Sequence, residues 1–489
     1  MKRALLLALG LLSGCGTRGS LYNNQLKPLP LVATSSKLVM IVPQTQRAVV
    51  LTPGEKTPRG FVISKGARFA QRVPGSELVA ILAGTAKLPK LDLVDVSSGE
   101  VQTLELPGFF DSIHFSPDGR FGVLIYAQGG VTGFAARNLN EVGLLSVGSR
   151  AVTRVQLDTE SLAPTQILFG PTDPGRQLVA VTLERGVALF DALHPEVAPR
   201  RISIRPQGSS SESTVLQTVF SGAGKFLFMR ASGLDDVIVV ELGNQVGQPV
   251  SASINFVSGG TGLTDIEAPP ALFNDSVLAI YSGSSQAFLL DAHGIADNAK
   301  KLEMTAPLSR VHLLQGSKVL LWNENSKTVA AWDIADGRTG TVVLDTAFTE
   351  PTLDGTLNKG IFPTAAALSV VTVLEETNRL RPKIQSIQLT SSVGPSVLDE
   401  KSQRIFFSVG GTASLVTMDL RSLQLAEVRL DQSVQQLFHL ENGDWLVADH
   451  GAPLGDITLL PAGTTERSTA LRYSDFAFTD DFDRPGDAR

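Results

Sequence analysis

The stretch that decides the fold is Asp111–Gln128, which reads "DSIHFSPDGRFGVLIYAQ". An alternating apolar segment stops at Ser116–Gly119 and then resumes as "FGVLIY". Pro117 presets φ for a turn, Asp118 can bond the backbone that follows it, and Gly119 accepts a positive φ. The stretch therefore predicts two antiparallel strands that are joined by a tight turn.

The same strand-turn-strand pattern recurs along the chain. Its copies are "FAQRVPGSELVAIL", "SIHFSPDGRFGVLIY", "QILFGPTDPGRQLVAVTL", "QTVFSGAGKFLFMR", "PALFNDSVLAIY", "RVHLLQGSKVLLW", "PSVLDEKSQRIFFSV" and "QLFHLENGDWLVAD". The spacing between the sixth and seventh copies is roughly double the usual one, and a degenerate copy is expected there around "GIFPTAAALSVVTVL". Repetition of this kind indicates a repeat architecture rather than several unrelated domains.

Most copies continue into a strand that ends in an acidic residue, a short turn and a fourth strand, as in "LDLVDVSSGEVQTLEL" and "VAAWDIADGRTGTVVL". A four-stranded antiparallel sheet with two apolar faces cannot bury both faces alone. Radial stacking of such sheets covers both faces of each one. We therefore expect an all-β fold, a single β-propeller of seven or eight four-stranded antiparallel blades over residues 35–474.

The stretch "VDVSSGEVQTLELPGFFDSIHFSPDGRFGVL" resembles the repeats of the TolB, YVTN and WD40-like β-propellers. The resemblance extends over nearly all of residues 35–474, but most copies keep only part of the family's motifs. One copy carries the full Ser-Pro-Asp-Gly turn, and one carries a Trp-Asp pair at Trp332 and Asp333. In such propellers the strand before the turn is the innermost one and lines the central channel. Family frequency favours seven blades, whereas the number of copies favours eight.

The chain begins "MKRALLLALGLLSGC", with a basic start and an apolar segment over Ala4–Leu12. This segment is too short to span a bilayer as a helix of about 20 residues, so it predicts a secretory signal. Leu12–Cys15 resembles the lipobox of bacterial lipoproteins. The resemblance implies cleavage of residues 1–14, lipidation of Cys15 and, with Gly16 following, an outer-membrane location. The alternative is an ordinary signal peptide with an incidental cysteine.

Two further segments flank the expected propeller. Residues 15–34 are polar and interrupted by proline, which predicts a lipidated flexible tether. Residues 475–489 are acidic and broken by glycine and proline, which predicts a disordered tail. Asp480, Asp481 and Asp483 in this tail could hold a cation, but they lack the glycine turn and bidentate glutamate of a calcium loop, so a solvated tail is expected.

Composition and motifs exclude several functions. The 489 residues carry a net charge of −6 and no run of Lys or Arg longer than two, so no nucleic-acid partner is expected. A single cysteine excludes an intramolecular disulfide and a zinc site of several thiolates. The nucleophile elbow, the P-loop and the H-E-x-x-H motif are absent from the sequence, so no catalytic residue and no cofactor are assigned.

Histidines supply the candidate site. Of six, three precede a turn at one position of the repeat: His114, His312 and His439. Other copies read Gln71, Leu168, Val219, Leu272 and Val397 at this position. Three imidazoles on innermost strands could converge on the axis and bind a metal or an anionic ligand. The alternative is that they pack between blades, each satisfied by a neighbouring carbonyl.

These observations favour a lipid-anchored envelope protein that faces the periplasm or the cell surface. We expect a non-enzymatic scaffold that binds a protein or an envelope polymer. One alternative is a propeller enzyme of the hydrolase or lactonase type, which would need convergent acidic and polar side chains at the channel mouth. Another is a small-ligand or metal sensor that uses the histidines.

Overall fold

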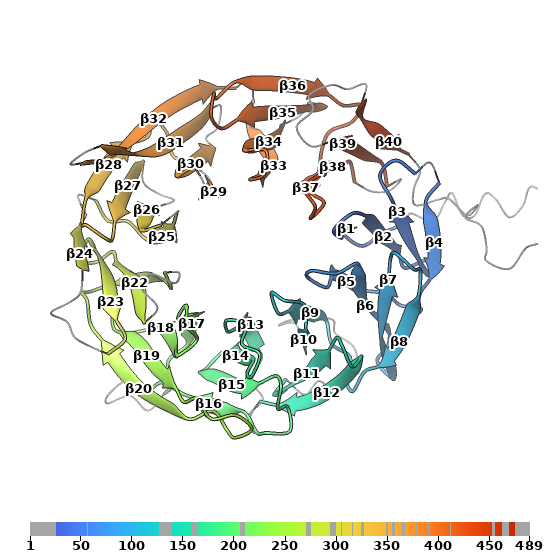
Figure 1. Ribbon diagram of the computed structural model, residues 1–489, viewed down its shortest axis with the longest axis horizontal. Helices are drawn as coiled ribbons and strands as arrows, with labels where there is room; N and C mark the ends of the chain where they lie inside the picture. Colours follow the sequence, from blue (N-terminus) through green and yellow to red (C-terminus); the bar gives the residue numbers. More distant parts are fainter. Residues whose placement is uncertain are drawn as a thin grey trace, which may run out of the picture.

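The computed structural model describes residues 26–474, except for 56, 127–138, 158–163, 206–210, 270–274, 294–299, 305, 315, 324–326, 349–350, 355–356, 364–366, 377–378, 390, 411, 452–454 and 462–468. In these residues forty strands form ten four-stranded antiparallel sheets. The sheets stand side by side as the blades of a closed ring around a central opening (Figure 1). The protein is thus an all-β propeller, as the sequence predicts.

Every blade uses four consecutive strands, with the first strand innermost (Figure 1). Blades 1 to 5 comprise β1 (Val32–Ala33), β2 (Leu38–Val42), β3 (Arg47–Leu51), β4 (Arg59–Val62); β5 (Phe69–Arg72), β6 (Leu78–Thr85), β7 (Leu88–Asp95), β8 (Val101–Glu105); β9 (Ser112–Phe115), β10 (Phe121–Ile125), β11 (Glu141–Ser146), β12 (Ala151–Gln156); β13 (Pro164–Phe169), β14 (Leu178–Leu183), β15 (Val187–Asp191), β16 (Arg200–Ile202); and β17 (Val215–Phe220), β18 (Phe226–Ala231), β19 (Val237–Leu242), β20 (Ala252–Val257).

Blades 6 to 10 comprise β21 (Leu263–Glu267), β22 (Ser276–Tyr281), β23 (Gln286–Asp291), β24 (Lys300–Glu303); β25 (Arg310–Leu313), β26 (Lys318–Trp322), β27 (Thr328–Asp333), β28 (Thr339–Val343); β29 (Thr352–Asp354), β30 (Lys359–Pro363), β31 (Ala367–Glu376), β32 (Arg379–Gln388); β33 (Val393–Asp399), β34 (Arg404–Val409), β35 (Ser414–Asp419), β36 (Leu425–Arg429); and β37 (Gln436–His439), β38 (Trp445–Asp449), β39 (Ile457–Pro461), β40 (Leu471–Tyr473).

The blade count differs from the prediction: the described residues form ten blades, not seven or eight. The sequence pattern does not predict blade 1, because its inner strand β1 has only two residues and begins within residues 15–34, the predicted tether. Blade 8 occupies the doubled spacing, and its inner strand β29 has only three residues. Strands this short cannot display the alternation from which the copies were counted.

A second difference concerns blade 6. The sequence pattern places its inner strand at "PALF", whereas the structure places β21 at Leu263–Glu267. Leu272, the predicted channel position of this blade, lies outside the described residues. The inner strand of blade 6 therefore carries other side chains than those that the sequence pattern predicts.

Apolar packing between neighbouring blades holds the ring together. The buried side chains form ten clusters, each shared by two adjacent blades. One cluster joins blade 1 to blade 10 and includes Leu38, Met40, Val447 and Leu459, which are at most 2% exposed. Because no blade mixes strands from both ends of the chain, this cluster closes the ring without a shared sheet.

Hydrogen bonds and the N-terminal segment support the same closure. The backbone N–H of Glu441 donates to the carbonyl of Thr34 at 3.2 Å, and that of Asn442 donates to Ser35 at 2.9 Å. Leu26, only 5% exposed, packs into the cluster between blades 1 and 10. The described chain therefore enters the ring at its closing seam.

The acidic residue that ends the third strand organises the turn after it. Asp95, Asp191, Asp291, Asp333 and Asp419 each accept a hydrogen bond from the backbone N–H two residues later, at 2.8 to 3.1 Å. Such Asx turns give the repeated acidic position a structural role.

The turn at Ser116–Gly119 is also architectural. The hydroxyl of Ser116 donates to the Asp118 carboxylate at 2.6 Å. Gly119 has a φ of 69°. A Cβ there would also overlap the carbonyl oxygen of Pro74 in blade 2, so glycine is required on two counts.

Within the described part of the chain, no helix is long and apolar enough to cross a membrane.

Candidate functional site

The three predicted histidines lie on innermost strands, His114 on β9, His312 on β25 and His439 on β37. Figure 1 shows these strands at separate places around the central opening. Among the described residues, no group of three or more His, Cys, Asp or Glu side chains could hold a metal ion. The structure therefore does not bring the three imidazoles together.

The three histidines also differ in register. His114 and His312 each precede the residue that closes their turn by two positions, but His439 precedes it by one. Because side chains alternate along a strand, this slip turns His439 to the opposite face of its blade. Its ring meets Phe406 of blade 9 edge-on at 5.6 Å, and neither buried ring nitrogen has a hydrogen-bond partner. Burial lowers the pKa of all three histidines.

A polar network joins the inner strands of blades 5, 6 and 7. The Gln217 amide donates to the Ile266 carbonyl at 2.8 Å and accepts from the Ile266 N–H at 3.2 Å. The Asp265 carboxylate accepts from the Val311 N–H at 3.0 Å. Side chains of one blade thus form hydrogen bonds with backbone groups on the inner strand of the next blade. These bonds stabilise a strand that has no neighbouring strand on its inner side.

Glu267 of blade 6 and His312 of blade 7 also lie in contact across two blades. A Glu267 carboxyl oxygen lies 3.6 Å from Nδ1 of His312. The pKa of Glu267 is raised to about 7, chiefly by burial; a hydrogen bond from the Leu313 backbone lowers it, and the nearby Asp265 charge adds a smaller rise. The second carboxyl oxygen is buried without a hydrogen-bond partner. This pair places a carboxyl and an imidazole, both with pKa values shifted by burial, side by side across the joint of blades 6 and 7.

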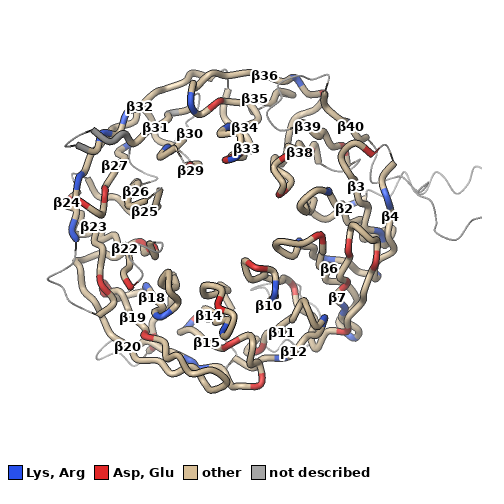
Figure 2. Tube along the Cα trace, viewed as in Figure 1, with Lys and Arg blue, Asp and Glu red and all other residues tan. Residues whose placement is uncertain are grey.

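Sequence reasoning missed Glu267. The signal was present, since Asp265 and Glu267 stand two apart on β21 and therefore share a face. The described inner strands carry two more carboxylates, Asp354 on β29 and Asp399 on β33. These lie on blades 8 and 9, and Asp399 accepts from the N–H of Lys401 in the following turn at 3.1 Å. Among the described inner strands, two carboxylates therefore share one blade and the others lie singly, while charged residues of both signs are spread around the whole ring (Figure 2).

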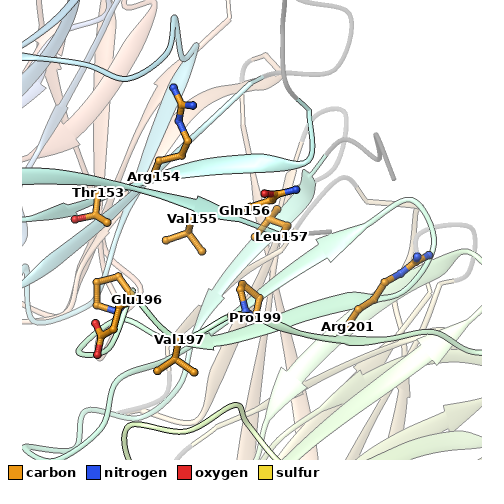
Figure 3. A pocket seen from close by; sticks show the side chains of 11 residues that line it. Thr153, Arg154, Val155, Gln156, Leu157, Glu196, Val197, Pro199 and Arg201 are labelled. Atoms are coloured by element: carbon orange, nitrogen blue, oxygen red, sulfur yellow. The ribbon is translucent and has the colours of Figure 1, made fainter. Parts of the chain in front are cut away.

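The outer rim holds a cavity of about 660 Å³, a wedge between blades 3 and 4. Thr153, Val155 and Leu157 line one side of it, and the loop Pro195–Pro199 lines the other (Figure 3). The wedge stays open because β16, the outer strand of blade 4, has only three residues and follows this proline-bracketed loop. Its volume lies within the range of ligand pockets, roughly 300 to 1,000 Å³.

The charged groups beside the wedge are already paired. Arg154 lies between this wedge and a second cavity of about 420 Å³. Its guanidinium lies 3.4 Å from the Glu141 carboxylate and donates to the Pro107 carbonyl at 2.9 Å. Burial, followed by the Glu141 charge, raises the pKa of Tyr126 to about 12. With its cations engaged, the wedge suits an uncharged or mixed surface such as a polypeptide better than a free anion.

Taken together, these sheets define the class of fold, a β-propeller of ten four-stranded antiparallel blades over the described residues. No protein-family model matches the chain. No curated protein matches it either.

Solved structures provide distant likenesses. "Dihydro-heme d1 dehydrogenase NirN in complex with DHE" is 14% identical over 84% of this chain and 76% of that one, with a TM-score of 0.46. "Crystal structure of the eukaryotic initiation factor" is 11% identical over 76% and 89%, with a TM-score of 0.45. The β-propeller domain of Cps50 (Swd1) from Myceliophteria_thermophila is 10% identical over 81% and 97%, with a TM-score of 0.35. Function must therefore be argued from this chain's own surfaces.

Proposed function

We propose that this protein is a lipid-anchored scaffold of the bacterial cell envelope that binds a protein or an envelope polymer without catalysing a reaction. The observation that carries the proposal is the open rim wedge between blades 3 and 4, with an apolar floor and paired charges. Rigid propellers commonly use such edges and loops for binding. A second candidate, an enzyme at the channel mouth, has less support because the inner carboxylates are dispersed over three blades.

The anchor is proposed from the sequence alone. Cys15 and the signal segment 1–14 lie outside the described residues, as does the tail 475–489. Lipid chains on Cys15 would hold the ring at the outer membrane, on the periplasmic or the surface side. Cys15→Ala should move the protein from the membrane fraction to the soluble fraction and abolish incorporation of labelled palmitate. Continued membrane association of the variant would overturn the anchor.

The binding role is tested by crosslinking in intact envelopes. Wild-type protein should give a discrete adduct of higher mass, identified by mass spectrometry. Thr153→Arg fills the wedge from an exposed position and should reduce that adduct. Thr341→Arg on β28 is the matched control, because it adds the same charge at an exposed position of another outer strand. Absence of any wild-type adduct would overturn the scaffold function.

A further inference from the structure

The outer strand of blade 5 has an unusual apolar face. Ile254 and Phe256 lie opposite Val240 and Ile238 of β19, which are fully buried against blade 4. Directly opposed residues share a face, so Ile254 and Phe256 also point toward blade 4. They are nevertheless 44% and 48% exposed. The three-residue β16 of blade 4 is too short to cover the six-residue β20.

The backbone of β20 is open on the same edge. The Gly243 N–H donates to the Ser251 carbonyl at 2.9 Å, which fixes the alternation of bonded and unbonded pairs between β19 and β20. By that alternation the N–H and C=O groups of Ala252, Ile254 and Phe256 face away from β19. The Phe256 N–H donates to the side chain of the preceding residue at 2.9 Å, which agrees with this direction. Ala252 and Ile254 therefore offer both groups to an incoming strand.

An exposed cation of blade 4 faces blade 5. Arg200 of β16 lies opposite Leu189, which is buried in the cluster between blades 4 and 5, so Arg200 also faces blade 5. Its side chain is exposed. Within the described ranges it makes no ion pair or side-chain hydrogen bond. An exposed apolar strand edge on blade 5 and a cation of blade 4 that faces this blade together define the chemistry of a ligand for this surface.

We propose that β20 receives an extended segment of a partner protein as a fifth strand of blade 5. The segment presents apolar side chains beside Ile254 and Phe256 and a carboxylate to Arg200. Strand addition of this kind draws its affinity from main-chain hydrogen bonds and its specificity from alternate side chains. The inference rests on the proposed scaffold function and names the chemistry of its partner.

A second copy of the chain is a poorer occupant. Antiparallel pairing of two β20 strands about a two-fold axis would keep the same face of both blades on one side. Arg200 of both copies would then lie on that side of the joined sheet, without a carboxylate to match either one. A partner strand that carries an acidic residue relieves this mismatch.

The probe is a labelled nine-residue peptide in which valine alternates with threonine and glutamate, measured by fluorescence anisotropy. A counterpart with lysine in place of glutamate controls for charge. Wild-type protein should bind the acidic peptide at least tenfold more tightly than the lysine peptide. Ile254→Pro should weaken acidic-peptide binding at least tenfold. The substitution removes an N–H that points away from β19, so it takes a donor from the incoming strand and breaks no hydrogen bond between β19 and β20. Val343→Pro is the matched control, since Val343 is 65% exposed on the edge strand β28.

Arg200→Glu provides a second variant on a different blade, at an exposed position. It should reverse the preference from the acidic to the lysine peptide. Equal affinity of wild type and Ile254→Pro, an unchanged preference in Arg200→Glu, or no binding to wild type would each overturn strand addition. If Ile254→Pro keeps the envelope adduct, this inference fails while the scaffold function stands.

Two measurements identify other occupants. Sedimentation of the purified protein should show no dimer that depends on β20. A dimer that Ile254→Pro dissociates would mean that a second copy of the chain occupies this edge. Amide exchange at Ala252 and Ile254 should be fast in the free protein. Slow exchange there would mean that a segment of this same chain covers β20, and it would overturn the proposal.

Discussion

Replacing Glu267 with glutamine should remove a specific pH dependence from the stability of the ring. In the folded protein the pKa of this carboxyl is raised from 4.5 to about 7, chiefly by burial. A carboxyl with a raised pKa contributes stability below its unfolded pKa, and that contribution is lost as the pH rises through the folded pKa. The affected window therefore runs from about pH 4.5 to about pH 7.

The magnitude follows from the shift. One pKa unit corresponds to about 1.4 kcal/mol, so a rise of this size corresponds to about 3.5 kcal/mol at most. The Glu267 side chain is 27% exposed, and residual solvent reduces that figure toward about 2 kcal/mol. Glutamine keeps the carbonyl oxygen that accepts from the Leu313 backbone and carries no charge at any pH.

The assay is urea unfolding of wild type and Glu267→Gln at half-unit steps from pH 4 to pH 8.5. The free energy of unfolding of the variant, minus that of wild type, should rise by about 2 to 3 kcal/mol across the window and then level off. Repeating the pair in a His312→Gln background separates the contribution of the imidazole 3.6 Å away. Glu303→Gln, an exposed carboxylate paired with Lys301, controls for loss of a surface charge. A difference that stays flat across the window would refute the buried carboxyl.

Three further predictions concern the fold and are read from thermal and urea unfolding. Leu459→Ala, fully buried at the seam of blades 1 and 10, should cost about 2 to 5 kcal/mol, whereas Leu88→Ala, 66% exposed, should cost little; equal losses would contradict closure by packing. Gly119→Ala should cost more than Gly75→Ala, because both have positive φ but only Gly119 meets backbone of another blade; equal costs would exclude that contact. Asp333→Ala removes the acceptor of three hydrogen bonds and should cost about 2 kcal/mol, and an unchanged midpoint would contradict the Asx-turn role.

Local rules allowed much of the fold to be predicted from the sequence. The Ser116–Gly119 turn and the acidic ends of the third strands follow from backbone preferences of single residues, which read directly from sequence. The blade number did not, because β1 and β29 are too short to show a period. The number of blades in the ring does not follow from local sequence patterns, because closure depends on packing between strands that are far apart in the chain.

The candidate sites show the same division. The innermost position of His114 and His312 was predictable. The one-residue slip at His439 was readable too, because His439 stands four residues before its turn glycine, Gly443, whereas His114 stands five before Gly119. Glu267 was missed because the inner strand of blade 6 was assigned seven residues too late. The rim surfaces follow from the shortness of β16, a property of one blade that becomes visible only beside its neighbours.

The central claim is that binding takes place on the rim of blades 3 to 5 rather than in the central channel. The most direct test is photo-crosslinking in intact envelopes, with a photoreactive side chain placed singly at exposed positions. Thr153 and Asn255 report on the rim, and His114 reports on the channel. We predict adducts with a common partner from both rim positions and none from His114. Adducts from His114 alone would contradict the account.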